Sequence, residues 1–212
     1  IPWTTLWEQA EQVAELELRF AAWEERSQSF DPFDQYADQE DGTWKIDYGV
    51  LELEITGEPE QERLLNSHPA TESLPEIRAE LLETRYMDYL EEMSEAVVSS
   101  FSTGSPLAGK DAAYEWWTDN EQDLATGETV ALFLIDALRL DLARELANRL
   151  RENYSIAEET RVSTLPSETK FVMAALTPVR AHRFRVKLRN GKLPVETGGQ
   201  RLDNYVTRTT FL

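Results

Sequence analysis

The feature that most constrains the fold is a run of six apolar residues, VALFLI at residues 130–135, which ends on the carboxylate Asp136. An uninterrupted apolar run of this length is typical of a β-strand buried on both faces of a parallel sheet. A helix is predicted to follow at once, over residues 140–153. A strand that passes directly into a helix is the opening half of a β-α-β unit, and it predicts an α/β fold with a parallel sheet here.

Asp136 lies at the carboxyl end of this predicted strand, which is where open parallel sheets bind their ligands. The carboxylate has two interpretations. Either it holds a ligand, or it satisfies the free amides and the dipole at the start of the following helix. Position alone favours the second interpretation.

A second candidate residue, Thr169, lies in STLPSETKFVMAAL, residues 163–176. Pro166 ends one element and a helix is predicted from Phe171, so the Thr169 hydroxyl should lie among unpaired amides at a helix start. Such amides bind phosphoryl groups. Simple capping by Ser167 or Thr169 explains the same spacing.

Asp136 and Thr169 support a stronger hypothesis together than either does alone. An aspartate at a strand end and a hydroxyl at the next helix start could hold the same metal ion. The metal would lower the pKa of the hydroxyl and make it a nucleophile.

Two segments of this part of the chain, FLIDALRLDLARELANRL and STLPSETKFVMAALTP, closely resemble the start of a PglZ domain. This domain is the alkaline-phosphatase-superfamily component of the BREX phage-defence systems. The upstream segments YMDYLEEMSEAVVSSF and DAAYEWWTDN resemble the helical region that precedes the domain. The resemblance is most specific over residues 130–178.

The resemblance implies a two-metal site, commonly of zinc, that acts on phosphomonoesters or phosphodiesters through a covalent phosphothreonine. By position it implies that Asp136 is a metal ligand and that Thr169 is both the nucleophile and a metal ligand. It also implies a mixed αβα fold and, as partners, other BREX subunits.

The chain departs from the family pattern downstream of Thr169, where the superfamily takes most of its metal ligands from Asp and His residues. The chain has only His68 and His182, and Glu196 and Asp203 are its only acidic residues after Thr169. We therefore expect a fragment that is inactive by itself, with the divalent metal bound in the intact protein. The parent is either a metal-dependent phosphoric ester hydrolase or a non-catalytic scaffold for partner subunits, so whether it is an enzyme stays open here.

Charge is distributed unevenly along the chain. Residues 1–128 carry 31 acidic and 7 basic side chains, whereas residues 178–212 carry 2 acidic and 8 basic ones. The acidic part should repel nucleic acid and anionic membranes, and the basic part should attract phosphate groups. High Asp and Glu content with only five lysines indicates either adaptation to concentrated salt or an ordinary acidic protein from an arginine-using genome.

The basic part contains RFRVKLRNGKLP, residues 183–194, which alternates as a strand does before an Asn-Gly turn at 190–191. Its basic side chains are candidates for binding phosphate, nucleotide or nucleic acid: Arg183, Arg185, Lys187 and Arg189. An edge strand that charge keeps soluble explains the same pattern.

Residues 1–128 are predicted to form an acidic, mainly helical region, with long helices over residues 3–26 and 75–101. The segment WKIDYGVLELEI, residues 44–55, alternates with a slip at Gly49, which predicts a short strand or hairpin. No apolar run approaches the roughly 20 residues of a membrane span. The absence of cysteine fits a cytoplasmic protein.

The complete prediction is an α/β protein of two domains. Residues 1–128 form the helical region with a small β element. Residues 129–212 form the first half of an alkaline-phosphatase-like αβα domain with a parallel sheet.

Overall fold

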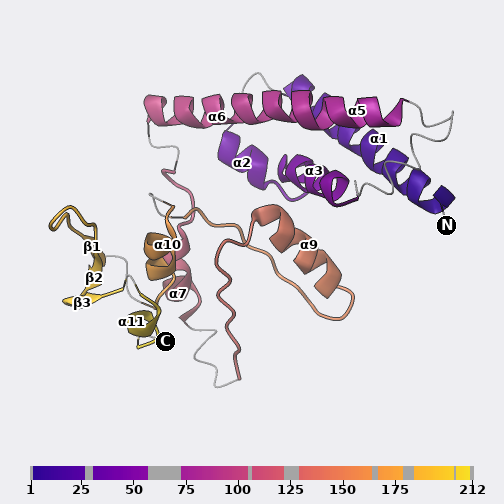
Figure 1. The fold of residues 1–212 in the computed structure, drawn as a ribbon. Coiled ribbons are helices and arrows are strands. Elements are labelled where there is room, and N and C mark those ends of the chain that lie inside the picture. Colours follow the sequence, from indigo (N-terminus) through magenta and orange to yellow (C-terminus); the bar gives the residue numbers. More distant parts are fainter. Residues whose placement is uncertain are drawn as a thin grey trace. The chain divides into compact units, whose positions relative to one another are not determined.

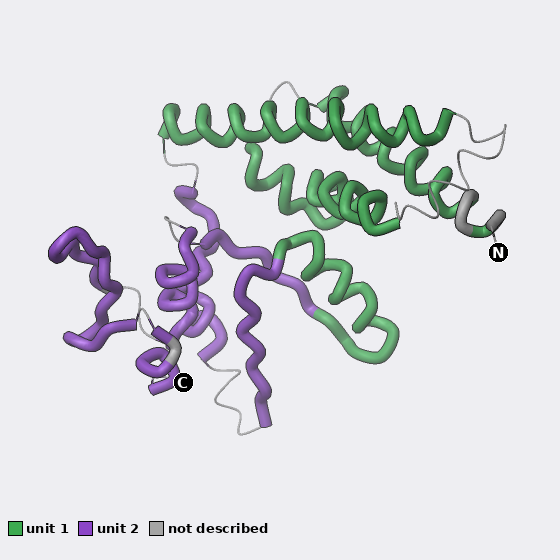
Figure 2. The backbone as a smooth tube through the Cα atoms, viewed as in Figure 1, with its two compact units in different colours: residues 1–106, 139–156 green, residues 107–138, 157–212 purple. Residues whose placement is uncertain are grey.

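The computed structural model divides into two compact units (Figure 2). Unit 1 comprises Ile1–Pro106 and Arg139–Ile156, and unit 2 comprises Leu107–Leu138 and Ala157–Leu212. The residues that the structure describes are 2–26, 31–56, 73–104, 107–121, 129–163, 167–178, 184–202 and 204–210.

Unit 1 is built from helices (Figure 1). They are α1 Pro2–Arg26, α2 Pro32–Ala37, α3 Trp44–Thr56, α5 Leu74–Glu80, the π-helical turn η2 Leu81–Arg85, α6 Tyr86–Thr103 and α9 Leu140–Leu150. Figure 1 shows α5 and α6 as parts of one long helix, and η2 lies between them in the chain. The predicted helices over residues 3–26 and 75–101 are therefore confirmed, and α9 confirms the helix predicted after Asp136.

The predicted strand or hairpin at residues 44–55 is wrong, because these residues form helix α3. Ile46, Val50 and Leu53 recur at the spacing of one helix face, and all three side chains are buried in the core of unit 1. The short alternation of apolar residues in this segment is compatible both with the two-residue period of a strand and with the 3.6-residue period of a helix. The helix forms because it places these three apolar side chains together in the core of unit 1.

Gly49 marks a close approach of α3 to α1 rather than a bulge. A Cβ atom at this position would lie 3.0 Å from Nη1 of Arg19 and 3.2 Å from a methyl carbon of Leu16. The glycine thus lets the two helices pack closely. The core that they share with η2 and α6 consists of Val13, Leu16, Phe20, Trp23, Ile46, Val50, Leu53, Leu81 and Tyr89.

Helix α9 belongs to unit 1 although it follows residues of unit 2 in the sequence. Arg144, which is only 4% exposed, donates to the backbone carbonyl of Asp38 at 2.5 Å and to that of Ala37. Its guanidinium carbon lies 5.0 Å from the ring centre of Trp44. Because the two carbonyls end α2, the arginine satisfies acceptors that the helix leaves unpaired. For this reason the compact units do not follow the sequence boundary between residues 128 and 129.

Unit 2 has shorter elements. They are η3 Ala113–Glu115, α7 Trp116–Asp119, α10 Thr169–Ala175, α11 Tyr205–Arg208 and the strands β1 Phe184–Val186, β2 Val195–Thr197 and β3 Gln200–Arg201. The strands form an antiparallel sheet in the order β1-β2-β3. The mixed content agrees with the α/β class. The sheet found among the described residues is antiparallel, however, and not the parallel sheet that was predicted.

The apolar run at residues 130–135 forms neither strand nor helix, so the prediction of a buried strand is wrong for this chain. Its side chains are exposed, Phe133 by 81% and Ile135 by 58%. A strand buried on both faces needs neighbouring strands that pair its backbone amides and carbonyls. The described part of the chain supplies no such neighbour for this run.

Candidate functional site

Asp136 lies in a turn between the irregular run 130–135 and α9, and its side chain is exposed. The next residue, Ala137, has a φ of 57°, which lies in the left-handed region that residues with a Cβ seldom adopt. The N-cap of α9 is Arg139, and the acidic residue of its first turn is Asp141. Asp136 is therefore not the residue that caps this helix, and the capping interpretation is wrong.

The start of α9 is organised by a pair of residues that the sequence analysis did not single out. Arg139 donates to the carboxylate of Asp141 from Nε at 3.1 Å and from Nη2 at 2.8 Å. The Asp141 side chain is fully buried, and this pairing raises the pKa of the Arg139 guanidinium. One signal in the sequence could have pointed to Asp141: together with Arg144, three residues further along α9, it places two charged side chains on one face of the helix.

Thr169 is the first residue of α10, which confirms that it lies at a helix start. The N-cap is Glu168, whose backbone carbonyl accepts from the amides of Phe171 at 2.8 Å and Val172 at 3.1 Å. Neither Ser167 nor Thr169 occupies the cap position. The Thr169 side chain is exposed and is accessible to a ligand.

The surroundings of Thr169 include one cation and an aromatic ring. Nζ of Lys170 lies 2.9 Å from the carboxylate of Glu168 and 4.7 Å from the ring centre of Phe171. Phe171 is buried in a small core with Ala174, Val195 and Leu202. Burial of Phe171 thus holds the start of α10 in place, while its polar side chains remain accessible.

Residues 111–119 and 159–162 contact each other, and Trp117 links them to the end of α10. Ala112 and Val162 pair as a parallel bridge, with hydrogen bonds of 2.9 Å on each side. Arg161 lies 2.5 Å from the carboxylate of Asp119. The indole of Trp117 donates at 2.7 Å to the carbonyl of Leu176, the C-cap of α10. The segment DAAYEWWTDN therefore folds together with the residues that carry Thr169.

No hydrogen bond or ion pair joins Asp136 to Thr169 in the described part of the chain, so their shared metal ion stays a prediction. Within the described ranges, no three His, Asp or Glu side chains gather in a group that could hold a metal ion. Since protein zinc sites use three or four protein ligands, these two residues do not fit a complete site by themselves. His68 and His182 lie outside the described residues.

The predicted Asn-Gly turn is confirmed in the basic segment. Asn190 and Gly191 have φ values of 51° and 73°, and the residues on either side, Arg189 and Lys192, exchange backbone hydrogen bonds. Arg185, Lys187 and Arg189 are exposed, and Arg189 also lies 3.2 Å from the carboxylate of Glu196. Arg183, the fourth predicted phosphate-binding residue, lies outside the described residues.

Residues 120–197 match the family model of the BREX system PglZ alkaline phosphatase-like domain. Over this segment the chain is similar to PglZ domains. The match contains both Asp136 and Thr169, and the family resemblance predicted from the sequence is confirmed. Neither the curated proteins nor the solved structures yielded a match to this chain.

The PglZ match links the chain to an alkaline phosphatase-like protein of phage defence. No helix among the described residues is both long enough and apolar enough to cross a bilayer.

Proposed function

We propose that this chain is part of a PglZ protein that hydrolyses phosphoric esters with a divalent metal in BREX anti-phage defence. The match of residues 120–197 to the alkaline phosphatase-like domain carries this proposal. The position of Thr169 at the start of α10 supports it.

In this proposal Thr169 is the nucleophile and Asp136 holds a metal ion. The first amides of a helix have no partner within the helix, and they favour an anion near the hydroxyl of a first-turn residue. The exposure of Thr169 allows a phosphoryl group to approach it. The metal, with zinc as the first choice, would act as a Lewis acid and lower the pKa of the hydroxyl.

Other BREX subunits are the proposed partners of this protein. The exposed cations Arg185, Lys187 and Arg189 are the proposed contacts to phosphate, nucleotide or nucleic acid. A cytoplasmic location is part of the same proposal, and the absence of cysteine supports it.

We expect the chain by itself to be inactive on phosphate esters, because Asp136 and Thr169 cannot complete a metal site without further ligands. The measurement is turnover of an aryl phosphate and an aryl phosphodiester by the chain with added zinc. Turnover that Thr169→Ala abolishes would show that this expectation is wrong.

The proposed roles are tested in the full-length parent protein. Thr169→Ala should abolish turnover, Thr169→Ser should retain part of it, and Asp136→Ala should reduce the bound zinc measured by elemental analysis. Thr209→Ala, at an exposed threonine outside the matched segment, is the control and should change neither. Full turnover by Thr169→Ala would rule out Thr169 as the nucleophile.

The second candidate function is a non-catalytic scaffold that binds partner subunits. The observation that favours it is the lack of a metal-competent group of side chains in the described ranges. A scaffold should form the same complex with other BREX subunits when Asp136 and Thr169 are both replaced by alanine, and size-exclusion chromatography of the mixture measures this. Phage defence that survives the double replacement would favour the scaffold, and defence that is lost would favour catalysis.

A further inference from the structure

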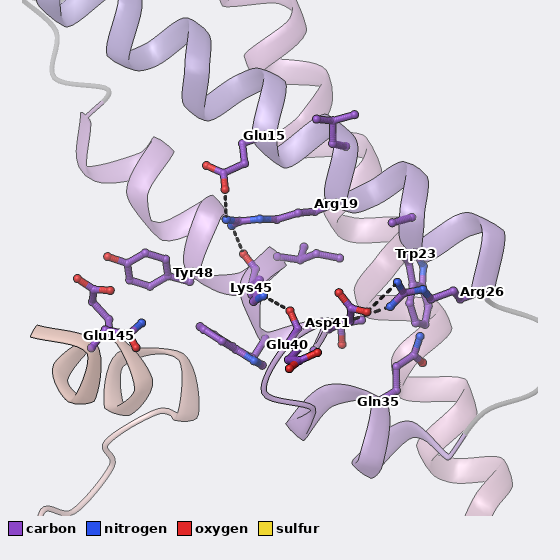
Figure 3. A pocket seen from close by; sticks show the side chains of 17 residues that line it. Glu15, Arg19, Trp23, Arg26, Gln35, Glu40, Asp41, Lys45, Tyr48 and Glu145 are labelled. Carbon is purple, nitrogen blue, oxygen red and sulfur yellow. Dashed lines mark hydrogen bonds and ion pairs between the residues drawn. The ribbon is translucent and has the colours of Figure 1, made fainter. Parts of the chain in front are cut away.

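Unit 1 contains a cavity of about 440 Å³ whose lining residues come from α1, α2, α3, α9 and the residues between α2 and α3 (Figure 3). Its volume lies within the range of small-molecule binding sites. Apart from Glu145 and Asn148, the lining residues lie outside the PglZ match. The cavity is therefore separate from the proposed functions of Asp136 and Thr169.

One part of the lining is apolar and aromatic. Trp23 and Trp44 are buried, and Leu18, Ala22 and Ile46 complete this wall. Such a wall suits the methylene groups of a flexible side chain or a polyamine, because long cationic chains bury their carbon atoms and keep their charge at a polar edge.

The cations of the lining are already engaged. Arg19 donates to the carboxylate of Glu15 and to the carbonyl of Lys45, both at 2.6 Å. Lys45 itself donates to the carbonyl of Glu40, and Arg26 lies 3.3 Å from the carboxylate of Asp41. Figure 3 shows these contacts around the cavity. An anionic ligand would have to displace them.

The carboxylates of the lining outnumber its cations. They are Glu15, Glu40, Asp41 and Glu145. Glu145 pairs with Arg149 at 2.7 Å, whereas the exposed carboxylate of Glu40 forms no ion pair among the described residues. Unit 1 as a whole carries 28 acidic and 10 basic side chains, so its field attracts cations and repels anions.

Two polar atoms of the lining residues also lack a hydrogen bond within the described part of the chain: an amide oxygen, which only accepts, and a hydroxyl oxygen, which accepts or donates. Oε1 of Gln35 and Oγ1 of Thr43 are buried and have no hydrogen-bond partner among the described residues. A buried acceptor without a partner costs stability. An alkylammonium group brings three donors and no acceptor, whereas an ionised phosphate brings acceptors.

We propose that this cavity binds an alkylammonium ligand, whose carbon chain packs on Trp23 and Trp44 and whose charge lies near Glu40. A free polyamine and a lysine side chain of a partner share this chemistry. The carboxylate of Glu40 is the residue that selects the charge, and the space beside Ala22 admits the chain.

The experiment measures binding of spermidine and of an acetylated, amidated lysine peptide to the whole chain by calorimetry, together with tryptophan fluorescence. We expect saturable 1:1 binding that Glu40→Gln weakens at least fivefold. Glu83→Gln removes one exposed carboxylate outside the lining and should change the affinity less than twofold. Ala22→Phe, checked for its helical circular dichroism, should abolish binding by filling the cavity.

Tighter binding of spermidine than of the peptide identifies a free polyamine as the source of the ligand, and the reverse identifies a partner lysine. An equal loss in Glu40→Gln and Glu83→Gln would show diffuse attraction to an acidic surface and would overturn the proposal. Absence of saturable binding, or tighter binding of inorganic phosphate, would overturn it as well. None of these outcomes depends on phosphatase activity.

Discussion

Units 1 and 2 differ most in how their side chains are packed. Among the described residues, nine buried hydrophobic side chains form the core of unit 1, whereas four form the core of unit 2. The units also differ in net charge. Unit 1 carries 28 acidic and 10 basic side chains, whereas unit 2 is nearly balanced with 12 acidic and 11 basic ones. Helix packing therefore keeps unit 1 folded against its own repulsion. Asp136 and Thr169, the predicted site residues, lie in unit 2, which has the smaller hydrophobic core among the described residues.

The units also differ in their polar contacts. In unit 1 the hydroxyls of Tyr36 and Tyr86 donate to the two oxygens of Asp47 at 2.6 and 2.8 Å. Burial, and then the hydrogen bond to Asp47, raise the pKa of both tyrosines well above the usual range. In unit 2 Arg161 pairs with partly exposed carboxylates. Its polar contacts should accordingly contribute less to stability.

The largest expected effect comes from the core of unit 1. Leu16 is fully buried, and Leu16→Ala should cost about 2–5 kcal/mol of unfolding free energy, because it removes packed methyl groups and leaves a cavity. Leu18, two residues along the same helix, is 71% exposed, and Leu18→Ala should change stability by less than about 0.5 kcal/mol. Denaturant unfolding followed by circular dichroism measures both, and equal effects would contradict the packing of α1.

The next effect tests whether α9 is part of unit 1. Arg144→Ala removes the two guanidinium donors to the end of α2 and the contact with Trp44, and leaves only the Trp44 indole on the Asp38 carbonyl. It should cost about 2–3 kcal/mol. Arg149→Ala, on the same helix but with a side chain that is 74% exposed, serves as the control and should lower stability much less. Hydrogen exchange of the α9 amides should accelerate in the first variant alone. If both variants behave alike, α9 does not dock through Arg144.

Alkaline pH should destabilise unit 1 in a way that depends on its tyrosines. In the unfolded chain tyrosine ionises near pH 10, whereas the folded pKa values of Tyr36 and Tyr86 are higher. Their contribution to stability is therefore complete below about pH 10 and is lost as the pH rises from there through the folded values. Tyr36→Phe and Tyr86→Phe should flatten this loss, as measured by denaturant unfolding between pH 8 and 12. Tyr154→Phe, at an exposed tyrosine, should leave the profile as it is.

The smallest expected effect concerns salt. Screening should relieve repulsion in unit 1 more than in unit 2, so sodium chloride and potassium chloride should raise the thermal midpoint of unit 1 more. Sulfate at the same ionic strength separates screening from the strengthening of apolar burial. A midpoint that stays flat across chloride concentration would favour an ordinary acidic protein over a salt-adapted one.

Elements with local signals could be predicted from the amino-acid sequence. The helices α1, α5–α6 and α9, the place of Thr169 at a helix start and the Asn190-Gly191 turn were all predicted. Each depends on periodicity, on proline or on a residue pair with a strong backbone preference, and such signals act within a few neighbouring residues. The PglZ resemblance also follows from short motifs, and the family match confirms it.

Only the tertiary structure decided the elements whose conformation depends on distant partners. The apolar pattern of residues 44–55 fits either a strand or a helix. These residues form a helix that packs closely on α1 at Gly49. The run 130–135 has strand character but no described strand pairs with it. On α9, Arg144 is buried while Leu146 is exposed, because the carbonyls of Ala37 and Asp38 and a tryptophan ring are available to the arginine. An apolar pattern in the sequence indicates which side chains can be buried. Whether they are buried depends on residues elsewhere in the chain that pack against them.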